Sequence, residues 1–384
     1  MTDQLIGAHN AHNGLHSEQG ALPGEHPGRS ANPLIKVQDV VWLEFEKPDL
    51  DKAEAFALAF GFSVALRTDD ELHLRGSDAD APCVLIRRGT RSRFVGPAFV
   101  AADDSDLLRL ADATGTTVRP LPETLGGLTV DLVDPSGIPL RVVSGVRRLE
   151  ELPSQKPHVF NFGASHDTVR ANSTQRPPRV PTRVQRLGHI VLQTPKYIEA
   201  LNWYLDHLGL IVSDFCYYPG QRERGPIMSF IRCDRGSTPA DHHTLAMALG
   251  PTHRYVHSAY QVCDLDALAA GGEYLREQGY FRSWGIGRHI QGSQIFDYWR
   301  DPEGDFLVEH FADGDMFDNT LEPGWAPLTA SGLYQWGPAP SKDFLGVGTP
   351  RESAREVALM LDALRHDNEF DLSALRGLFN VANS

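Results

Sequence analysis

The stretch RYVHSAY, residues 254–260, has a close counterpart in RFVGPAF, residues 93–99. Further along, DPEG (residues 301–304) matches DPSG (residues 134–137), and an apolar strand pattern follows each tetrapeptide. Matching segments in the same order and at similar spacing are typical of an internally repeated structural unit. The sequence therefore predicts two related copies of one scaffold.

Each copy begins with a short apolar strand that leads into a helical pattern. In the first copy VVWLEF (residues 40–45) precedes a helical pattern at 51–60, and in the second GHIVL (residues 188–192) precedes one at 197–208. Within each copy a strand–helix–strands unit is predicted to occur twice, which indicates an α+β fold.

The composition of the chain changes along its length, and this predicts five segments. The polar segments at the start and in the middle lack an apolar period, which is typical of loops and disordered tails. The predicted segments are a disordered leader (1–33), a first domain (34–149), a linker (150–182), a second domain (183–322) and a C-terminal extension with helices (323–384).

Composition excludes several classes of protein. Of 384 residues, 41% are hydrophobic and 22% are charged, the balance of a soluble globular protein. No run of about 18 apolar residues predicts a membrane span, and a net charge of −14 disfavours nucleic acid as a partner. The four cysteines lack CxxC spacing, so we interpret them as reduced thiols of a cytoplasmic protein: Cys83, Cys216, Cys233 and Cys263.

Three potential metal ligands occur in the second copy alone. The sequence alignment places His189 opposite Trp42, His257 opposite Gly96, and Glu309 opposite Val142. Each histidine taken singly would more often be structural. A duplicated scaffold should, however, have kept some structural residues in both copies, so the joint absence from the first copy favours a function.

The chemistry of these residues favours a metal site. Two neutral imidazoles and one carboxylate form the facial set that leaves coordination positions open on Fe(II). His189, His257 and Glu309 each lie on a predicted strand, where alternate side chains share one face. Three such strands in one curved sheet could direct the three ligands into a common concavity.

With these residues identified, the chain resembles the type I extradiol catechol dioxygenases of the vicinal oxygen chelate superfamily, over about residues 34–315. The resemblance implies two tandem domains, each of paired βαβββ modules in a curved, mostly antiparallel sheet, with the metal in the second domain. It also implies that His189, His257 and Glu309 are the iron ligands.

The resemblance extends to residues around the metal. DHHTLA (residues 241–246) is similar to the family segment that carries the acid–base histidine, which implies that role for His243. His242 should then point to the opposite face of its strand. His289 and Tyr298, nine residues apart, match the family's substrate-side His and Tyr.

The family activity implied is cleavage of a catechol-type ring beside its diol by Fe(II) and O2, giving a hydroxymuconic semialdehyde-type product in aromatic catabolism. Mn(II) would also accept this ligand set, and a homo-oligomer is expected. The leader and extension exceed the usual family length and bear on oligomeric arrangement rather than on chemistry. Three alternatives stay open: cleavage of a hydroquinone, a glyoxalase-like isomerase or lyase using Zn(II) or Ni(II), and a metal-free small-molecule binding protein of the antibiotic-resistance type.

Overall fold

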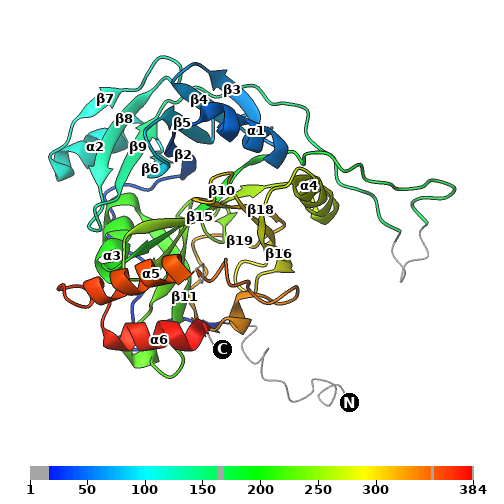
Figure 1. Ribbon diagram of the computed structural model, residues 1–384. Coiled ribbons are helices and arrows are strands. Elements are labelled where there is room, and N and C mark those ends of the chain that lie inside the picture. Colours follow the sequence, from blue (N-terminus) through cyan, green and yellow to red (C-terminus); the bar gives the residue numbers. More distant parts are fainter. Residues whose placement is uncertain (1–16, 162–167, 347–349, 383–384) are drawn as a thin grey trace, which may run out of the picture.

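Two large β-sheets dominate the computed structural model, which describes residues 17–161, 168–346 and 350–382 (Figure 1). The first sheet belongs to the first predicted copy and is drawn in blue and cyan. Its two modules are β2 (Asp39–Lys47), α1 (Leu50–Phe60), β3 (Ser63–Arg67), β4 (Glu71–Arg75) and β5 (Val84–Arg88), followed by β6 (Arg93–Val100), α2 (Asp104–Thr114), β7 (Val118–Pro120), β8 (Leu128–Val133) and β9 (Pro139–Ser144).

The second sheet is built from the same modules. They are β10 (Arg186–Thr194), α3 (Tyr197–Leu208), β11 (Leu210–Tyr217), β12 (Met228–Cys233) and β14 (Leu245–Leu249), followed by β15 (Arg254–Gln261), α4 (Leu265–Glu277), β16 (Arg282–Arg288), β17 (Ile295–Arg300) and β18 (Leu307–Ala312). Short strands β13 (Ala240–Asp241) and β19 (Met316–Phe317) pair separately.

Strand order confirms the repeat. The first sheet runs β3-β4-β5-β2-β6-β9-β8-β7, and the second contains β11-β12-β14-β10-β15-β18-β17-β16, which is the same order module by module. In each copy the first and last strands of one module pair in parallel, and all other pairs between module strands are antiparallel. The predicted α+β class, with paired βαβββ modules, is therefore confirmed.

Local sequence signals explain where the helices begin and end. Asp49, Asp103 and Asp264 each precede a helix and accept a hydrogen bond from a backbone N–H of its first turn. Gly61 and Gly209 end α1 and α3 with φ of 112° and 63°, a conformation that only glycine adopts without strain. The buried apolar residues of these helices pack against the sheets.

The two copies pack against each other through aromatic and charged contacts. The His310 ring stacks on Phe60 with centroids 3.7 Å apart, and its Nε2 donates to the Phe60 carbonyl at 2.7 Å. Lys47 of the first copy forms a buried ion pair with Asp301 of the second and a half-buried one with Glu303. These contacts hold the two sheets together, through β18 of the second copy and the turn that precedes it.

Residues 17–33 correct the prediction of a disordered leader. β1 (Glu18–Gln19) pairs with β20 (Gly324–Pro327) at the edge of the second sheet. The Arg222 guanidinium donates to Glu25 at 2.7 Å, and His26 Nε2 bonds the side chain of Asn202 at 2.8 Å. These polar partners lie far along the chain, so the local composition did not reveal them. Residues 1–16 lie outside the described residues.

The C-terminal extension adds β20, a short 3-10 helix (Ser331–Leu333), α5 (Pro350–Ala363) and α6 (Leu372–Ala382). In Figure 1 the last two helices, in orange and red, lie beside the second copy, and Glu369 between them accepts hydrogen bonds from two backbone N–H groups of α3. Among the helices in the described part of the chain, none has the length and apolar character to cross a bilayer.

Candidate metal centre

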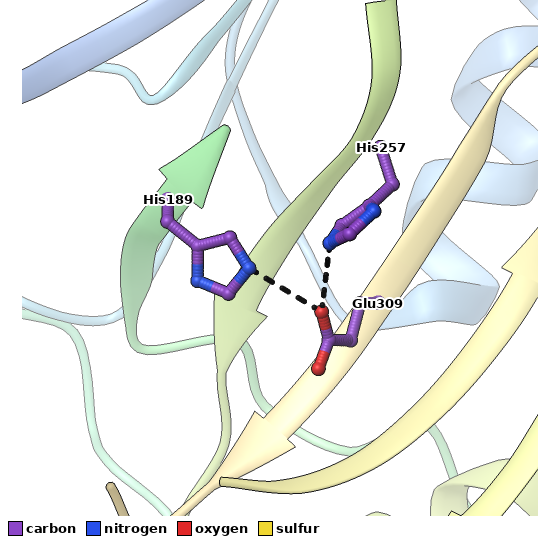
Figure 2. A group of neighbouring side chains, drawn as sticks. All are labelled: His189, His257 and Glu309. Carbon is purple, nitrogen blue, oxygen red and sulfur yellow. Dashed lines mark ion pairs between the residues drawn. The ribbon is translucent and has the colours of Figure 1, made fainter. Parts of the chain in front are cut away.

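His189, His257 and Glu309 converge on one point inside the second copy. They lie on β10, β15 and β18, and one potential ligand atom from each falls within 4.8 Å of the others. Figure 2 shows both imidazoles turned toward the same carboxylate oxygen, with Nε2 of His189 at 3.5 Å and Nε2 of His257 at 3.4 Å from Glu309 Oε2. The three strands thus bring together residues that are up to 120 positions apart in sequence.

Strand register explains this convergence. His189 pairs with Ala259 of β15, Ala259 pairs with Glu309 of β18, and Glu309 pairs with Tyr298 of β17. These side chains therefore form one row across the sheet. His257 lies two residues along β15 from Ala259, so it shares the same face. The small alanine leaves space between the two ligand strands.

Burial makes these three groups unusual. Glu309 is fully buried, and neither carboxylate oxygen has a geometrically acceptable hydrogen bond among the described residues; the same holds for Nδ1 of His189 and of His257. Burial raises the pKa of Glu309, but the two facing imidazoles outweigh it and hold the pKa below its ordinary value. A buried carboxylate is stable only when paired or bound to a metal, so the donor set fits a divalent cation.

The row in the first copy has a different content and corrects the sequence alignment. Ala98 of β6 pairs with Arg141 of β9, so Arg141, and not Val142, occupies the position of Glu309. The sequence alignment was wrong by one residue because β18 begins three residues after Gly304, whereas β9 begins two residues after Gly137. Trp42 and Gly96 do occupy the positions of His189 and His257, as predicted. The reason is that β2 pairs with β6 in the same register as β10 pairs with β15.

Arg141 neutralises the charge of two acidic side chains in the first copy. Its guanidinium forms an ion pair with Glu44, and its Nε lies 3.3 Å from Asp131, the residue that pairs with Arg141 as Tyr298 pairs with Glu309. Trp42 Nε1 also donates to Glu44, at 3.1 Å. A cation thus stands where the second copy has an unpaired acid, and this row of the first copy offers no set of metal ligands.

His243 lies directly beside the cluster. Its ring faces that of His189 with centroids 3.9 Å apart, and burial, reinforced by the neighbouring histidines, lowers its pKa well below the ordinary value. The prediction that His242 points to the opposite face is wrong: its Nδ1 lies 3.0 Å from Nδ1 of His243. Residues 242–244 form a bend between β13 and β14, so strand alternation does not apply to them.

His289 and Tyr298 meet on the other side of the cluster. The Tyr298 hydroxyl lies 2.9 Å from His289 Nε2, and His289 Nδ1 lies 2.6 Å from the Leu333 carbonyl. Burial lowers the pKa of His289 to about 4, so the ring is neutral near pH 7. Because a carbonyl can only accept, Nδ1 donates to Leu333 and Tyr298 donates to Nε2. His289 Nε2 is also 3.9 Å from Glu309.

The C-terminal extension contributes to this wall, which corrects the view that it bears on oligomeric arrangement alone. Besides the Leu333 carbonyl, Phe344 packs against Trp284 and Tyr298 with ring centroids 4.4 and 5.0 Å away. Asp343 accepts from Ser283 at 2.5 Å and holds the segment in place. No local sequence pattern predicts these contacts, because they join segments that are 40 to 60 residues apart.

Asp214 is a functional candidate that the sequence did not reveal. Its Oδ2 lies 2.7 Å from His242 Nε2, from a position in β11 where the register with β12 shifts by one residue. Such a bulge redirects a side chain without leaving a residue signature. The histidine pair could have suggested that an acidic partner exists, but not which of the chain's acids it is.

Comparisons with known proteins place the chain among relatives. Residues 186–309 match the model of the Glyoxalase/Bleomycin resistance protein/Dioxygenase superfamily. Metapyrocatechase 2 of Cupriavidus necator is 32% identical over 313 residues, which cover 80% of this chain and 92% of that protein. An iron-dependent extradiol dioxygenase of Rhodococcus jostii (strain RHA1) is 23% identical over 79% of this chain and 97% of its own length.

A solved structure has the same fold. The Mn(II)-bound glyoxalase from Novosphingobium aromaticivorans superposes with a TM-score of 0.65 and 24% identity, covering 80% of this chain and 94% of that one. At this identity the likeness concerns the fold alone.

Proposed function

This chain belongs to the extradiol dioxygenases of the Glyoxalase/Bleomycin resistance protein/Dioxygenase superfamily, and from that premise we propose that it opens the ring of a catechol-type substrate beside its two hydroxyl groups. Fe(II) is the metal and O2 the co-substrate, and both oxygen atoms enter a hydroxymuconic semialdehyde-type product. The reaction would serve the catabolism of aromatic compounds.

His189, His257 and Glu309 would hold the iron through both imidazole Nε2 atoms and the carboxylate. The observation that carries this proposal is the fully buried Glu309, whose Oε2 faces the imidazoles of His189 and His257 at 3.5 and 3.4 Å. When bound, Fe(II) supplies open coordination positions at which a catecholate and O2 can be brought together.

His243 would take a proton from a substrate hydroxyl and return it later in the reaction. A neutral imidazole can do both, because its unprotonated ring nitrogen accepts a proton and the resulting imidazolium can donate it again. Its place against His189 keeps it within the same enclosed site. His243 is buried, with the ring of Phe230 centred 5.1 Å from its own.

Tyr298 and His289 would hold the ring of the substrate in register. The Tyr298 proton is engaged by His289, so the phenolic oxygen is left to accept a hydrogen bond from a substrate hydroxyl. Trp284 and Phe344 pack around Tyr298 and restrict its movement. An aromatic substrate would thus lie beside residues with matching apolar faces.

The test is an anaerobic reconstitution. The metal-free protein is loaded with Fe(II), mixed with catechol or 2,3-dihydroxybiphenyl, and exposed to air. We expect a yellow ring-opened product from the iron-loaded protein and none from the metal-free control. Bound iron without a coloured product from any of a panel of alkyl-, aryl- and carboxy-catechols would contradict the proposal.

A glyoxalase-like isomerase or lyase is the second candidate, favoured by the fold it shares with the Mn(II)-bound glyoxalase. It would act without O2 and would work with Mn(II), Zn(II) or Ni(II). Assays of a ketoaldehyde–thiol adduct under nitrogen, with each metal in turn, separate the two activities. The dioxygenase proposal requires consumption of O2, and Mn(II) in place of Fe(II) would support the same reaction.

We also propose that residues 34–149 and 183–322 form two separate domains. We further propose that the protein is cytoplasmic and forms a homo-oligomer. The two copies of one strand order support the division. Sedimentation velocity of the full chain tests the oligomer: a species of 42.4 kDa at all concentrations would contradict it.

A further inference from the structure

A buried chain of hydrogen bonds leads from β11 to the candidate acid–base residue. Asp214 Oδ2 lies 2.7 Å from His242 Nε2, and His242 Nδ1 lies 3.0 Å from His243 Nδ1. Asp214, His242 and His243 are 8%, 1% and 4% exposed. This series of hydrogen bonds ends at Nδ1 of His243, so it does not involve Nε2, the other nitrogen of that ring.

The acceptor at the start of this chain fixes the direction of both hydrogen bonds. An ionised carboxylate can only accept, so His242 carries its proton on Nε2. In a neutral His242 the Nδ1 atom then has a lone pair, and it accepts from Nδ1–H of His243. A neutral imidazole has one N–H, so Nε2 of His243 is left without a proton.

Two glycines allow the backbone to lie close to the side chains of Asp214 and His242. A Cβ on Gly324 would lie 2.0 Å from Asp214 Oδ1, and one on Gly292, which has a φ of 80°, would lie 2.9 Å from His242 Nδ1. Both positions therefore require glycine where Asp214 and His242 meet. No other residue would leave the two side chains this close to the backbone.

A second network fixes the backbone of His242. Ser213 Oγ donates to the His242 carbonyl at 2.5 Å, and the fully buried guanidinium of Arg232 donates to Ser213 Oγ at 2.9 Å. Arg232 also donates to the backbone carbonyls of Asp318 and Leu321. The bend that carries both histidines is thus anchored independently of any metal.

On the basis of the proposed function, we propose that Asp214 and His242 are positioning residues that hold His243 with its proton on Nδ1. Nε2 of His243 is then available to take the proton of a catechol hydroxyl. With the opposite tautomer, the lone pair would point at His242 and could not reach the substrate. The arrangement uses the same logic by which a buried carboxylate orients a catalytic histidine in hydrolases.

The tautomer itself can be measured in the wild-type protein. Histidine is labelled with 15N, the metal-free protein is studied by NMR, and the His243 signals are identified by their loss in His243→Gln. We expect the proton of His243 on Nδ1. A proton on Nε2, or on both nitrogens, would overturn the proposal, because His242 would then be the donor.

Two substitutions of His242 test the functional consequence in the iron-loaded enzyme. His242→Phe keeps a ring but removes both hydrogen bonds, and we expect kcat to fall about 10- to 100-fold, as for other residues that orient a functional histidine. KM and iron content should stay within about twofold of wild type. His242→Gln can donate to Asp214 and accept from His243, so it should restore kcat to within about fivefold.

Asp214→Asn has a matched control in Asp234→Asn. The two acids have side chains that are 11% and 10% exposed, but Asp234 pairs with Lys36 at 2.5 Å instead of a histidine. We expect Asp214→Asn to lower kcat about as much as His242→Phe, and Asp234→Asn to leave it unchanged. Equal losses in the two acid variants, or wild-type kcat in His242→Phe, would overturn the proposal.

Failure of the proposed function would be recognised separately. If the iron-loaded wild type cleaves no catechol, the proposed function fails, whereas the NMR measurement still decides the tautomer. If a variant loses iron or melts early, the wild-type tautomer remains the deciding result.

Discussion

The two copies carry matching rows of side chains across sheets of the same strand order, and the rows share only one residue type. The second copy has an acid with two imidazoles facing it where the first has a closed ion pair. The rows read His189, Ala259, Glu309 and Tyr298 in the second copy, and Trp42, Ala98, Arg141 and Asp131 in the first.

This difference shows how one scaffold can be either a structural or a functional unit. In the first copy the charges neutralise each other, so the row stabilises the fold without any ligand. In the second copy Glu309 forms no ion pair with a lysine or arginine among the described residues, and imidazoles face it instead. A buried acid of this kind costs stability unless an ion binds, which is typical of a functional site.

The largest effect is expected from Glu309→Gln. The amide removes the single negative charge among the three proposed ligands, so the protein should lose iron, and activity should fall well beyond the roughly 10- to 100-fold typical of changes outside the ligand shell. Iron content after anaerobic loading and the initial rate with catechol measure this. Metal should also raise the melting temperature of wild type but not of the variant. Full iron occupancy in Glu309→Gln would remove Glu309 from the site.

His243→Ala should give the next largest effect. Loss of the general base should lower kcat about 10²- to 10⁴-fold, while iron remains bound because no proposed ligand is changed. His73→Gln is the matched control, since His73 is a buried histidine on β4 of the first copy. Turnover that survives His243→Ala, or falls equally in His73→Gln, would show that the acid–base role lies elsewhere.

Tyr298→Phe should have a moderate effect. Loss of one hydroxyl that contacts the substrate should lower kcat/KM about 10-fold, the equivalent of one hydrogen bond. Asp131 occupies the same position in the first copy, so Asp131→Asn should leave steady-state kinetics unchanged. The two variants are compared across several catechol concentrations. Identical kinetics for Tyr298→Phe and wild type would exclude contact with the reacting hydroxyls.

Arg141→Met should have the smallest effect on activity but a measurable one on stability. Without the guanidinium, the buried Glu44 keeps the Trp42 N–H as its one partner in the described part of the chain, which should lower the free energy of unfolding by about 1 to 3 kcal/mol. Urea unfolding measures this, and iron content and kcat should stay at wild-type values. A variant that loses iron would mean that the first copy takes part in metal binding.

The sequence predicted the repeat, the fold class and which residues of the second copy cluster, because the strand patterns and anchors were present in both copies. It misplaced the counterpart of Glu309 by one position, since apolar strands align equally well in neighbouring registers. Arg141 becomes recognisable only from the pairing of β6 with β9.

Other features depended on contacts distant in sequence. The relation of His242 to His243 followed from a bend instead of a strand, and Asp214 reached the pair through a β-bulge. Phe344 packs onto Tyr298 from the C-terminal extension. Propensity and periodicity are local properties, so they could not foresee any of these three arrangements.

The most direct test of the difference between the copies is a crystal structure of the anaerobically iron-loaded protein, with anomalous data at the iron edge. We expect one peak per chain, between Nε2 of His189, Nε2 of His257 and the Glu309 carboxylate, and none beside Arg141. A peak elsewhere, or a loaded crystal with no iron at these three side chains, would contradict the account.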